Sequence, residues 1–406
     1  MTTAAPVAFD PFEPGFVESP YEQYARLRMH DPVHWSALLE GWVLTRHDDV
    51  VALLRDPTVS VELDNARATS VVELQRVRQA RAGRRSDTLV LRDDPDHNRL
   101  RKLLQRPFGP RPVEGLRAIV TERVDAAIAE LAPRGAMDVI GDFAYPLPVA
   151  IFNEMLGLPD EDAPRVRAWI QAVARLLDPV IDDEEHARCQ ALMNEMYDYL
   201  DDQIEVKRRA PADDVLSALV QAEEDGDRLT RDELVAQVVT LYVAGHEPTM
   251  SLIGNGLLAL LRQPDQLAVV RAQPEMLPNA VNELLRYDGP NQFVRRIAVQ
   301  PMTIGRREIA AGDVIYVAVG AANRDPERWT DPDRVRVDRP DAAHHVQFGS
   351  GVHHCLGAHL ARLQAEVALG ALLFRLDDVA LAGDPVWSER MVIRGLQRLP
   401  ITYRAA

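Results

Sequence analysis

Residues 348–357, which read F-G-S-G-V-H-H-C-L-G, carry the most informative pattern in the chain. Cys355 is one of only two cysteines among 406 residues, and Gly349, Gly351 and Gly357 surround it. Glycine allows backbone conformations and close approaches that a Cβ would forbid. A helical pattern follows directly, so Cys355 is predicted to lie where a loop meets a helix N-terminus. The free N–H groups at such a position favour an anion, which lowers the pKa of a thiol and favours the thiolate.

Three further roles are open to Cys355 besides that of a thiolate ligand. A lone cysteine is most often a small buried apolar residue. A zinc site is a second possibility, because several histidines lie near the cysteine in the sequence: His344, His345, His353, His354 and His359. Zinc prefers four ligands at recurring spacings, which this group does not show. A nucleophilic cysteine would need a paired base, for which His353 or His354 is available. None of the three roles accounts for the glycines and Phe348.

The loop resembles the haem-binding loop of the cytochrome P-450 family, whose pattern is F-G-x-G-x-[HR]-x-C-x-G. All five fixed positions match, and His353 fits the sixth. The resemblance implies that Cys355 is the axial thiolate ligand of a haem b. It also implies that Phe348, Gly349, His353 and Gly357 belong to the haem site. Further matches in the family's order extend the resemblance over roughly residues 10–404.

The resemblance implies one large haem domain over residues 1–406, with about the first ten residues loose. Length alone would allow two domains, but no linker or shift in composition divides the chain. The net charge of −16 argues against general nucleic-acid binding and against binding to an anionic membrane. Cys189 and Cys355 provide no disulfide framework, which favours a reducing cytoplasm. Residues 1–10 show neither a signal peptide nor a membrane anchor, as in the soluble bacterial members of the family.

The spacing of apolar residues predicts a mainly α fold with a small β region. Helices are expected at residues 21–29, 48–55, 113–131, 148–156, 160–174, 184–207, 215–222 and 278–287. Strands are expected at residues 33–35, 41–45, 291–298, 302–304 and 314–319.

Three segments are expected to surround a substrate pocket, on the strength of the resemblance. Residues 57–92 lack clean periodicity and would form a variable loop over the pocket, although a solvated surface loop accounts for them equally well. Residues 160–210 would form the lid, and 394–400 a terminal hairpin whose tip enters the pocket. Candidate lining residues from the lid are Leu176, Leu177, Val180, Ile181 and Met193, for which a helix core is the alternative.

The resemblance implies two functions for the helix predicted near residues 95–104, which are to bind the haem propionates and to dock the electron donor. His97 and Arg101 are four residues apart and share a helix face, and they match the family's ligands of the haem propionates. Arg99, Lys102 and Arg106 add basic charge to an acidic chain. A solvated face accounts for them from sequence alone. The resemblance implies instead a docking patch for a ferredoxin-type electron donor, to which Arg362 is a possible addition.

A long helix is predicted from Thr230, whose hydroxyl and the later Glu233 fit a capping box, to about residue 262. A membrane span is rejected because polar residues interrupt the apolar run. The residues that match the family's oxygen-binding stretch are Ala244, Gly245, Glu247, Pro248 and Thr249. Ala244 and Gly245 would leave room beside the haem, and Glu247 would be the acid of an acid–alcohol pair. Pro248 stands where the family has the alcohol, with Thr249 one residue later, so proton delivery departs from the family pattern.

The remaining matches concern support for the haem. Glu283 and Arg286 fit a buried ion pair behind the haem, with Arg339 as the third member. Arg296 matches a propionate-binding arginine, and Arg295 is the alternative on the opposite face of the same predicted strand. His345, ten residues before Cys355, matches a further propionate ligand.

The activity implied by the resemblance is O2-dependent oxidation of a small, apolar, natural-product-like molecule in secondary metabolism. Electrons would come from a separate ferredoxin and ferredoxin reductase, because no flavin or nicotinamide fingerprint occurs in the sequence. Two alternatives stay open. The same haem could couple or desaturate substrates without inserting oxygen, which Pro248 motivates. A haem-based gas sensor or carrier, without turnover, is the alternative from another class.

Overall fold

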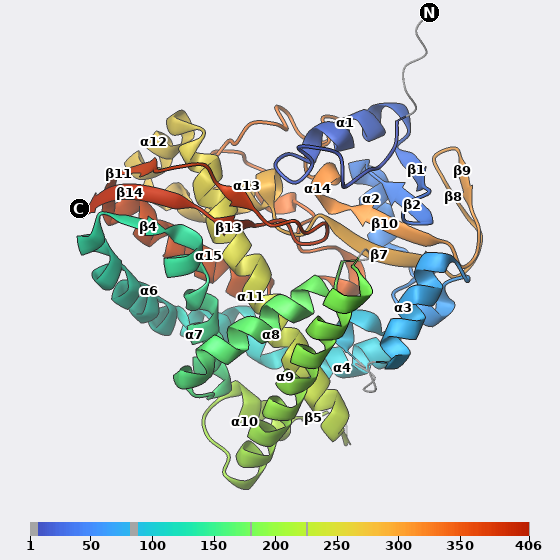
Figure 1. Cartoon of the computed structure of the whole chain (residues 1–406), viewed down its shortest axis with the longest axis horizontal. Coiled ribbons are helices and arrows are strands. Elements are labelled where there is room, and N and C mark those ends of the chain that lie inside the picture. The colour runs from blue at the N-terminus through green and yellow to red at the C-terminus, as the bar shows by residue number, and fades with distance from the viewer. Residues whose placement is uncertain (1–6, 82–87, 179–180, 225, 406) are drawn as a thin grey trace, which may run out of the picture.

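A computed structural model describes residues 7–81, 88–178, 181–224 and 226–405. It shows a large helical body beside a small β region (Figure 1). The N-terminal helices are α1 Tyr21–His30, α2 His47–Arg55, α3 Ser70–Arg81, α4 Asp96–Leu104 and α5 Pro110–Gly115. The helical body contains α6 Arg117–Leu131, α7 Pro146–Leu156, α8 Ala163–Arg175, α9 Asp183–Arg209, α10 Val215–Val220 and α11 Arg231–Leu261. The later helices are α12 Pro264–Ala272, α13 Leu277–Asp288, α14 Val319–Ala322 and α15 Ala358–Phe374.

The main sheet has five strands in the order β1-β2-β10-β7-β3. Its members are β1 Val33–Ser36, β2 Gly41–Leu44, β3 Val59–Ser60, β7 Phe293–Ala298 and β10 Val314–Ala318. A second sheet pairs β11 Leu376–Leu381, β14 Pro400–Ala405 and β4 Ala136–Asp138 in that order. The two-stranded pairs are β5 Glu223–Glu224 with β6 Asp227–Arg228, β8 Met302–Ile304 with β9 Arg307–Ile309, and β12 Val386–Trp387 with β13 Leu396–Arg398. The strands of the main sheet therefore come from both ends of the sequence.

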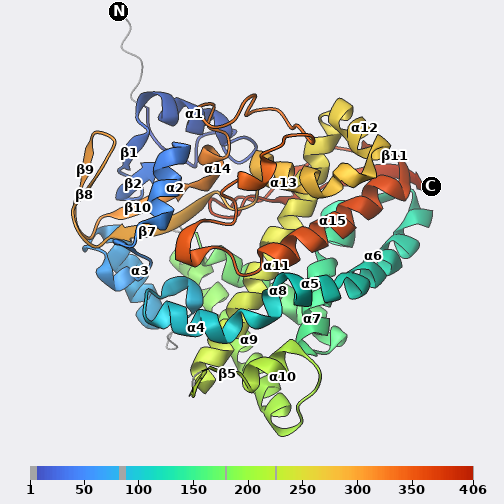
Figure 2. The ribbon, with the colours of Figure 1, turned by 180° about the vertical axis from the view of Figure 1, so that it is seen from behind.

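Helix α11 is the centre of the helical body. It contacts α7, α8, α9, α13 and α15, and seen from behind it runs beside α15 (Figure 2). Its start is fixed by the predicted capping box, in which the Glu233 N–H donates to the Thr230 hydroxyl at 3.2 Å and the Thr230 N–H donates to the Glu233 carboxylate at 2.8 Å. The helix is buried on nearly all sides, by Leu, Ile and Val side chains together with small residues and several polar ones.

Apolar clusters cover both faces of the main sheet. Phe9, Tyr24 and Phe293 belong to one cluster, and Leu53 and Ile315 belong to the other. Residues 1–6 lie outside the described residues, whereas the Phe9 side chain is 3% exposed and packs edge-on against Phe293. The expected loose N-terminus therefore does not include Phe9.

The structure corrects two of the predicted elements. Residues 57–92 were expected to form a loop, but α3 lies within them, and the Thr69 hydroxyl caps it by accepting from the Val72 N–H at 3.2 Å. Apolar and charged residues are mixed along α3 without a helical period, so the spacing of apolar residues did not predict this helix. The helix predicted at residues 113–131 is divided in two at Gly115 and Leu116.

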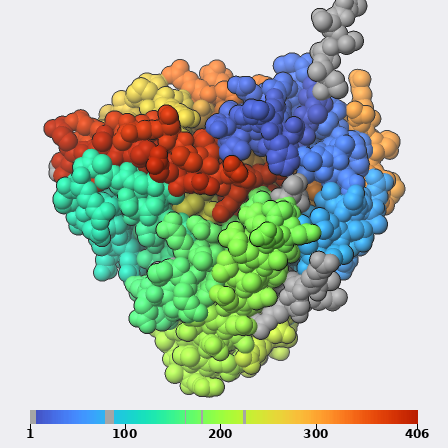
Figure 3. Space-filling model, in the orientation of Figure 1, coloured from blue at the N-terminus to red at the C-terminus, as the bar shows by residue number. Residues whose placement is uncertain are grey.

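The C-terminal segment crosses one face of the molecule between the N-terminal elements and the pair α8 and α9 (Figure 3). In the described part of the chain, no helix is long and apolar enough to cross a membrane.

Candidate active site

The loop before α15 presents Cys355. The Cys355 N–H donates to the Phe348 carbonyl at 2.9 Å, which closes the loop. Gly349 and Gly351 have φ values of 71° and 73°, which favour glycine. A Cβ on Gly351 would also lie 2.4 Å from the Leu54 carbonyl oxygen, so the loop could not lie against α2 with another residue there.

The environment of the thiol differs from the sequence-based expectation. Burial raises the pKa of Cys355, and the Gly357 N–H and the charges of Arg101 and Arg362 offset this only in part. Helix α15 begins three residues further on, so its N-terminus does not dominate. A thiol in this setting becomes a thiolate when a metal cation replaces its proton.

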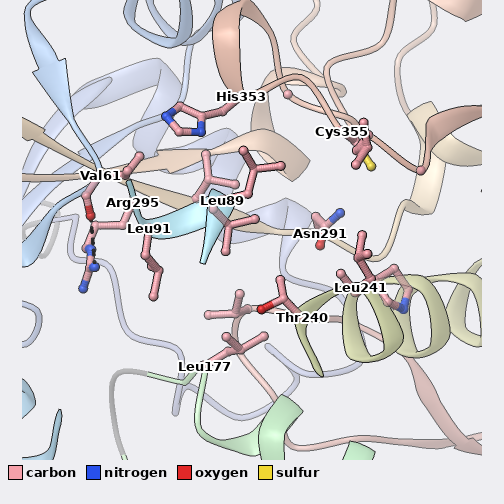
Figure 4. Close-up of a pocket in the computed structure, with 18 of the residues that line it drawn as sticks. Val61, Leu89, Leu91, Leu177, Thr240, Leu241, Asn291, Arg295, His353 and Cys355 are labelled. Carbon is pink, nitrogen blue, oxygen red and sulfur yellow. Dashed lines mark hydrogen bonds between the residues drawn. The ribbon is translucent and has the colours of Figure 1, made fainter. Parts of the chain in front are cut away.

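The Cys355 side chain opens into a cavity of about 1160 Å³ (Figure 4). The Phe348–Leu356 loop and α4, α11 and β7 all contribute to its wall. From the expected lid, Leu176, Leu177, Ile181 and Met193 line it as predicted, and Val180 lies outside the described residues. The C-terminal segment contributes Val392, whereas none of residues 394–400, the predicted terminal hairpin, lines this cavity.

Side chains that donate hydrogen bonds gather on the cavity wall near Cys355. The His97 and His353 rings lie 4.2 Å apart, and the Arg101 guanidinium donates to the His354 carbonyl at 3.0 Å. Both ring nitrogens of His97 are buried without a hydrogen bond. Burial, together with Arg296, His97 and Arg101, lowers the pKa of His353 to about 3. Burial likewise lowers the pKa of Arg296 to about 10. The one described acid within 4 Å of these four side chains is Asp94, whose carboxylate lies 3.5 Å from His97 Nδ1. Negatively charged oxygens of a ligand would provide partners for the remaining donors.

The predicted oxygen-binding stretch lies at the cavity, with one exception. Ala244, Gly245, Pro248 and Thr249 line it, whereas Glu247 does not. The Thr249 hydroxyl donates to the Gly245 carbonyl at 2.8 Å, so it is turned toward the helix backbone. A Cβ on Gly245 would lie 2.0 Å from the Phe152 ring, so this glycine admits the ring.

Glu247 is held on the other side of α11. Its carboxylate accepts from Arg390 of the C-terminal segment and lies 3.8 Å from His246 Nδ1. Burial disfavours the charged form, but His246 and Arg390 outweigh burial and lower the pKa of Glu247. The acid and the alcohol are therefore present, but they do not form a hydrogen-bonded pair.

The predicted support for the site is assembled and fully buried. Glu283 accepts from Arg286 at 2.7 and 2.8 Å and from Arg339 at 2.9 Å. Both arginines also donate to backbone carbonyls of residues 323–334. The triad thus ties α13 to the segment that precedes the cysteine loop.

His345 is placed away from the cavity lining. Its Nδ1 accepts from the Gln347 N–H at 3.1 Å, and its ring lies 5.4 Å from the ring of Phe348. Burial, with the charges of Arg362 and Arg286, lowers its pKa to about 3. These contacts show that His345 supports the loop before Cys355. His345 does not line the cavity, so the structure shows no contact through which it could bind a propionate.

The alternatives for Cys355 receive no support from the described residues. There, no group of three or more His, Cys, Asp or Glu side chains is arranged to hold a metal ion, so the zinc alternative has no ligand set. Burial lowers the pKa values of His353 and His354, and neither ring has a described hydrogen bond to the Cys355 sulfur. The base that a nucleophilic cysteine requires is therefore missing there.

Comparison with known proteins assigns the fold and the site to a class. The family model for cytochrome P450 matches residues 50–386, and the chain belongs to the cytochrome P450 family of haem monooxygenases. The cytochrome P450 monooxygenase PikC of Streptomyces venezuelae is 41% identical over 99% of this chain and 96% of its own. The polyketide biosynthesis cytochrome P450 PksS of Bacillus subtilis is 34% identical over 97% and 98%. The structure of cytochrome P450epoK bound to epothilone D matches with a TM-score of 0.90 and 30% identity, over 98% and 99%.

The residues present fit the haem that this family binds. The Cys355 thiol lies on one wall of the cavity. Beside it are four basic side chains that can donate hydrogen bonds to an anion: His97, Arg101, Arg296 and His353. Nothing lies within 4 Å of a Cβ built on Gly357, which lines the same wall, so a flat group can approach the backbone there.

Two features of the site were not found from the sequence. Arg390 is 143 residues from its partner Glu247, and no local pattern connects them. Gln75 and Tyr316 reach the cavity beside Arg295. Side chains alternate between the two faces of a strand, so the sequence could have placed Tyr316 on the same face as Arg295. That prediction would have required the register of β7 and β10.

Proposed function

We propose that this protein uses a haem b, bound through Cys355, to oxidise a small and largely apolar molecule of natural-product type. The observation that carries the proposal is the Cys355 thiol opening into a cavity of about 1160 Å³ beside unpaired donors. When bound, the haem supplies O2 activation, and a thiolate ligand favours O–O cleavage.

The residues of this chain have two tasks, which are to bind the haem and to place hydrogen-bonding groups beside the cavity. His97, Arg101, Arg296 and His353 would hold the haem propionates, and Gly357 would leave room for the flat haem ring. Thr249 offers a hydroxyl at the cavity wall, and Glu247 holds an ionised carboxylate behind it. Because Glu247 is ionised and Pro248 has no N–H, neither residue by itself donates a proton to the cavity.

A natural-product substrate is supported by the relatives. One is named for polyketide biosynthesis, and a solved structure of another holds epothilone D. The apolar part of the wall here includes Leu89, Leu91, Leu177 and Leu241. Such a surface favours a ligand that removes apolar area from water.

The test is the absorption spectrum of the purified, dithionite-reduced protein with and without carbon monoxide. A strongly red-shifted Soret band is expected from a thiolate-ligated haem. Cys355→Ala should abolish that band, while Cys189→Ala, the matched control at the other free cysteine, should keep it. A band typical of histidine ligation in fresh wild-type protein would contradict the assignment of Cys355.

The electron donor is proposed to be an acidic ferredoxin that docks at Lys102 and Arg106. Both side chains are exposed, at the end of α4 and just beyond it. Arg99 no longer belongs to this patch, because its guanidinium already donates to Glu233 and lies 3.4 Å from Asp227. The paired Arg362, whose Nε donates to Asn282, adds little. The proposed location is the cytoplasm, since the cysteines are free.

Charge reversal tests this patch. Lys102→Glu with Arg106→Glu should slow ferredoxin-driven turnover and flatten its dependence on ionic strength. The matched control is Arg188→Glu on α9, whose side chain is 70% exposed. Equal rates in the double variant and the control would remove the docking proposal.

A second candidate reaction is oxidative coupling or desaturation without oxygen insertion. Pro248 at the position of the family's alcohol, together with the Thr249 hydroxyl bound to the Gly245 carbonyl, favours it. Turnover under isotopically labelled O2 decides, because label in the product would refute this candidate.

A further inference from the structure

Arg295 places a guanidinium on the cavity wall, where the described residues offer it no carboxylate partner. Its Nη1 donates to the Gln75 amide oxygen at 3.1 Å, and its Nη2 lies 3.5 Å from the Val61 carbonyl. Among the residues that the structure describes, no acidic side chain forms an ion pair with it. Burial lowers its pKa, with Tyr316 opposing the shift. A mostly buried charge without a counter-ion is costly, so an anion at this point would be stabilised.

Further donors surround the same point. Tyr316 of β10 lies directly opposite Arg295 of β7 in the sheet register, so both side chains leave the same face. Burial raises the pKa of Tyr316, so its hydroxyl stays protonated and can donate. The Gln75 amide oxygen is used by Arg295, which leaves the amide NH2 as a donor. All three residues line the cavity.

Two carboxylates in this part of the fold, Glu62 and Glu40, do not pair with Arg295. Glu62 accepts from the Asp93 N–H at 3.0 Å and lies 3.9 Å from Arg92. Glu40, close enough to affect Tyr316, accepts from the Ser70 hydroxyl and the Val71 N–H. Glu62 and Glu40 are therefore held by other donors, and Asp64, which also lines the cavity, is solvent-exposed.

Arg295 is separate from the group assigned to the haem propionates. Arg296 pairs with Ile315 in the register and leaves the opposite face of β7, toward His353. In Figure 4, Arg295 and Cys355 lie at opposite sides of the pocket, with Leu89 between them. Because the two side chains leave opposite faces of β7, one anion cannot bind Arg295 and Arg296 at the same position.

We propose that the cavity binds an apolar molecule with one terminal carboxylate. The carboxylate is held by Arg295, Tyr316 and Gln75, and the apolar chain runs past Leu89 toward Cys355. This inference rests on the proposed function, to which it adds the charge and the orientation of the substrate. The end remote from the carboxylate is then the end presented for oxidation.

The test compares saturated fatty acids of 8 to 16 carbons with their methyl esters, using the haem-loaded protein. Dissociation constants come from the change in the haem absorption band and independently from titration calorimetry. The best acid should bind about 10- to 100-fold more tightly than its ester, as expected for charge-assisted hydrogen bonds to a carboxylate. Arg295→Gln should weaken binding of the acid far more than binding of the ester and so remove this preference.

Three further variants sharpen the comparison. Arg295→Lys should retain part of the preference, because it keeps the charge and loses the fork of donors. Tyr316→Phe should reduce the preference by about tenfold or less, as expected for one hydrogen bond. Arg404→Gln, which removes an arginine that is 71% exposed, is the matched control and should behave as wild type.

The proposal is overturned if wild type binds no acid of the series better than its ester, or if Arg295→Gln keeps the preference. Loss of haem from Arg295→Gln would also overturn it, by assigning Arg295 to the propionates. A missing thiolate spectrum with an intact acid preference in calorimetry would instead refute the proposed function alone.

Discussion

Replacing Glu283 with glutamine should severely destabilise this protein, although the new side chain has nearly the same shape. Glu283 is 0% exposed, and its carboxylate is the shared partner of Arg286 and Arg339, which are 0% and 3% exposed. The Arg336 N–H donates to it as well, at 2.8 Å. The variant leaves two buried guanidinium groups without a counter-charge, and breaking a buried ion pair costs about 3–5 kcal/mol. That is a large part of the roughly 5–15 kcal/mol that stabilises a folded domain.

The assay is urea unfolding of the haem-loaded protein at neutral pH, with the haem content measured in parallel. The matched control is Asp265→Asn, which neutralises the acid of an ion pair with Arg334 whose side chains are 54% and 59% exposed. An exposed pair contributes about 0–1 kcal/mol, so the control should be nearly neutral. If Glu283→Gln loses no more stability than Asp265→Asn, the triad does not stabilise the fold through its charges.

Two other predictions concern His345 and Pro248. Burial lowers the pKa of His345 to about 3, whereas an unfolded histidine binds its proton near pH 6.5. The folded state therefore loses about 1.4 kcal/mol per pH unit as the pH falls between these values. His345→Asn should make unfolding less dependent on pH in that window; an unchanged slope would contradict the buried neutral ring. Pro248→Ala should restore an N–H for the Ala244 carbonyl and raise the free energy of unfolding by up to about 3 kcal/mol, measured by thermal unfolding. No gain would mean that this carbonyl already has a partner.

The sequence predicted those parts of the site that depend on local patterns. The capping box of Thr230 and Glu233, the glycines beside Cys355 and the i, i+3 pair of Glu283 and Arg286 each lie within a few residues of one another. Their geometry follows from helix and turn rules, whatever the rest of the chain does. The family model confirms the resemblance that these patterns carried.

The parts that the sequence did not reveal depend on contacts between distant residues. The ion pair of Arg390 with Glu247 can be predicted only if the path of the C-terminal segment is known. The position of Tyr316 opposite Arg295 can be predicted only if the register of β7 and β10 is known. Arg99 likewise has a distant contact that the sequence did not reveal, because this basic residue of the local cluster pairs with Glu233 across the fold. Charge in the sequence gives no information on which charges remain free.

Arg394, near the end of the chain, determines when the active site can form during synthesis. It donates to the carbonyls of Val17 and Glu18 and forms an ion pair with Asp288 at 2.7 Å. Val392, two residues earlier, completes the cavity wall. The ribosome makes the N-terminal partners first, and they must wait for almost the whole chain before these contacts close. The cavity wall is therefore incomplete until the chain has folded past residue 392, and a nascent chain that stalls before that residue has no complete pocket.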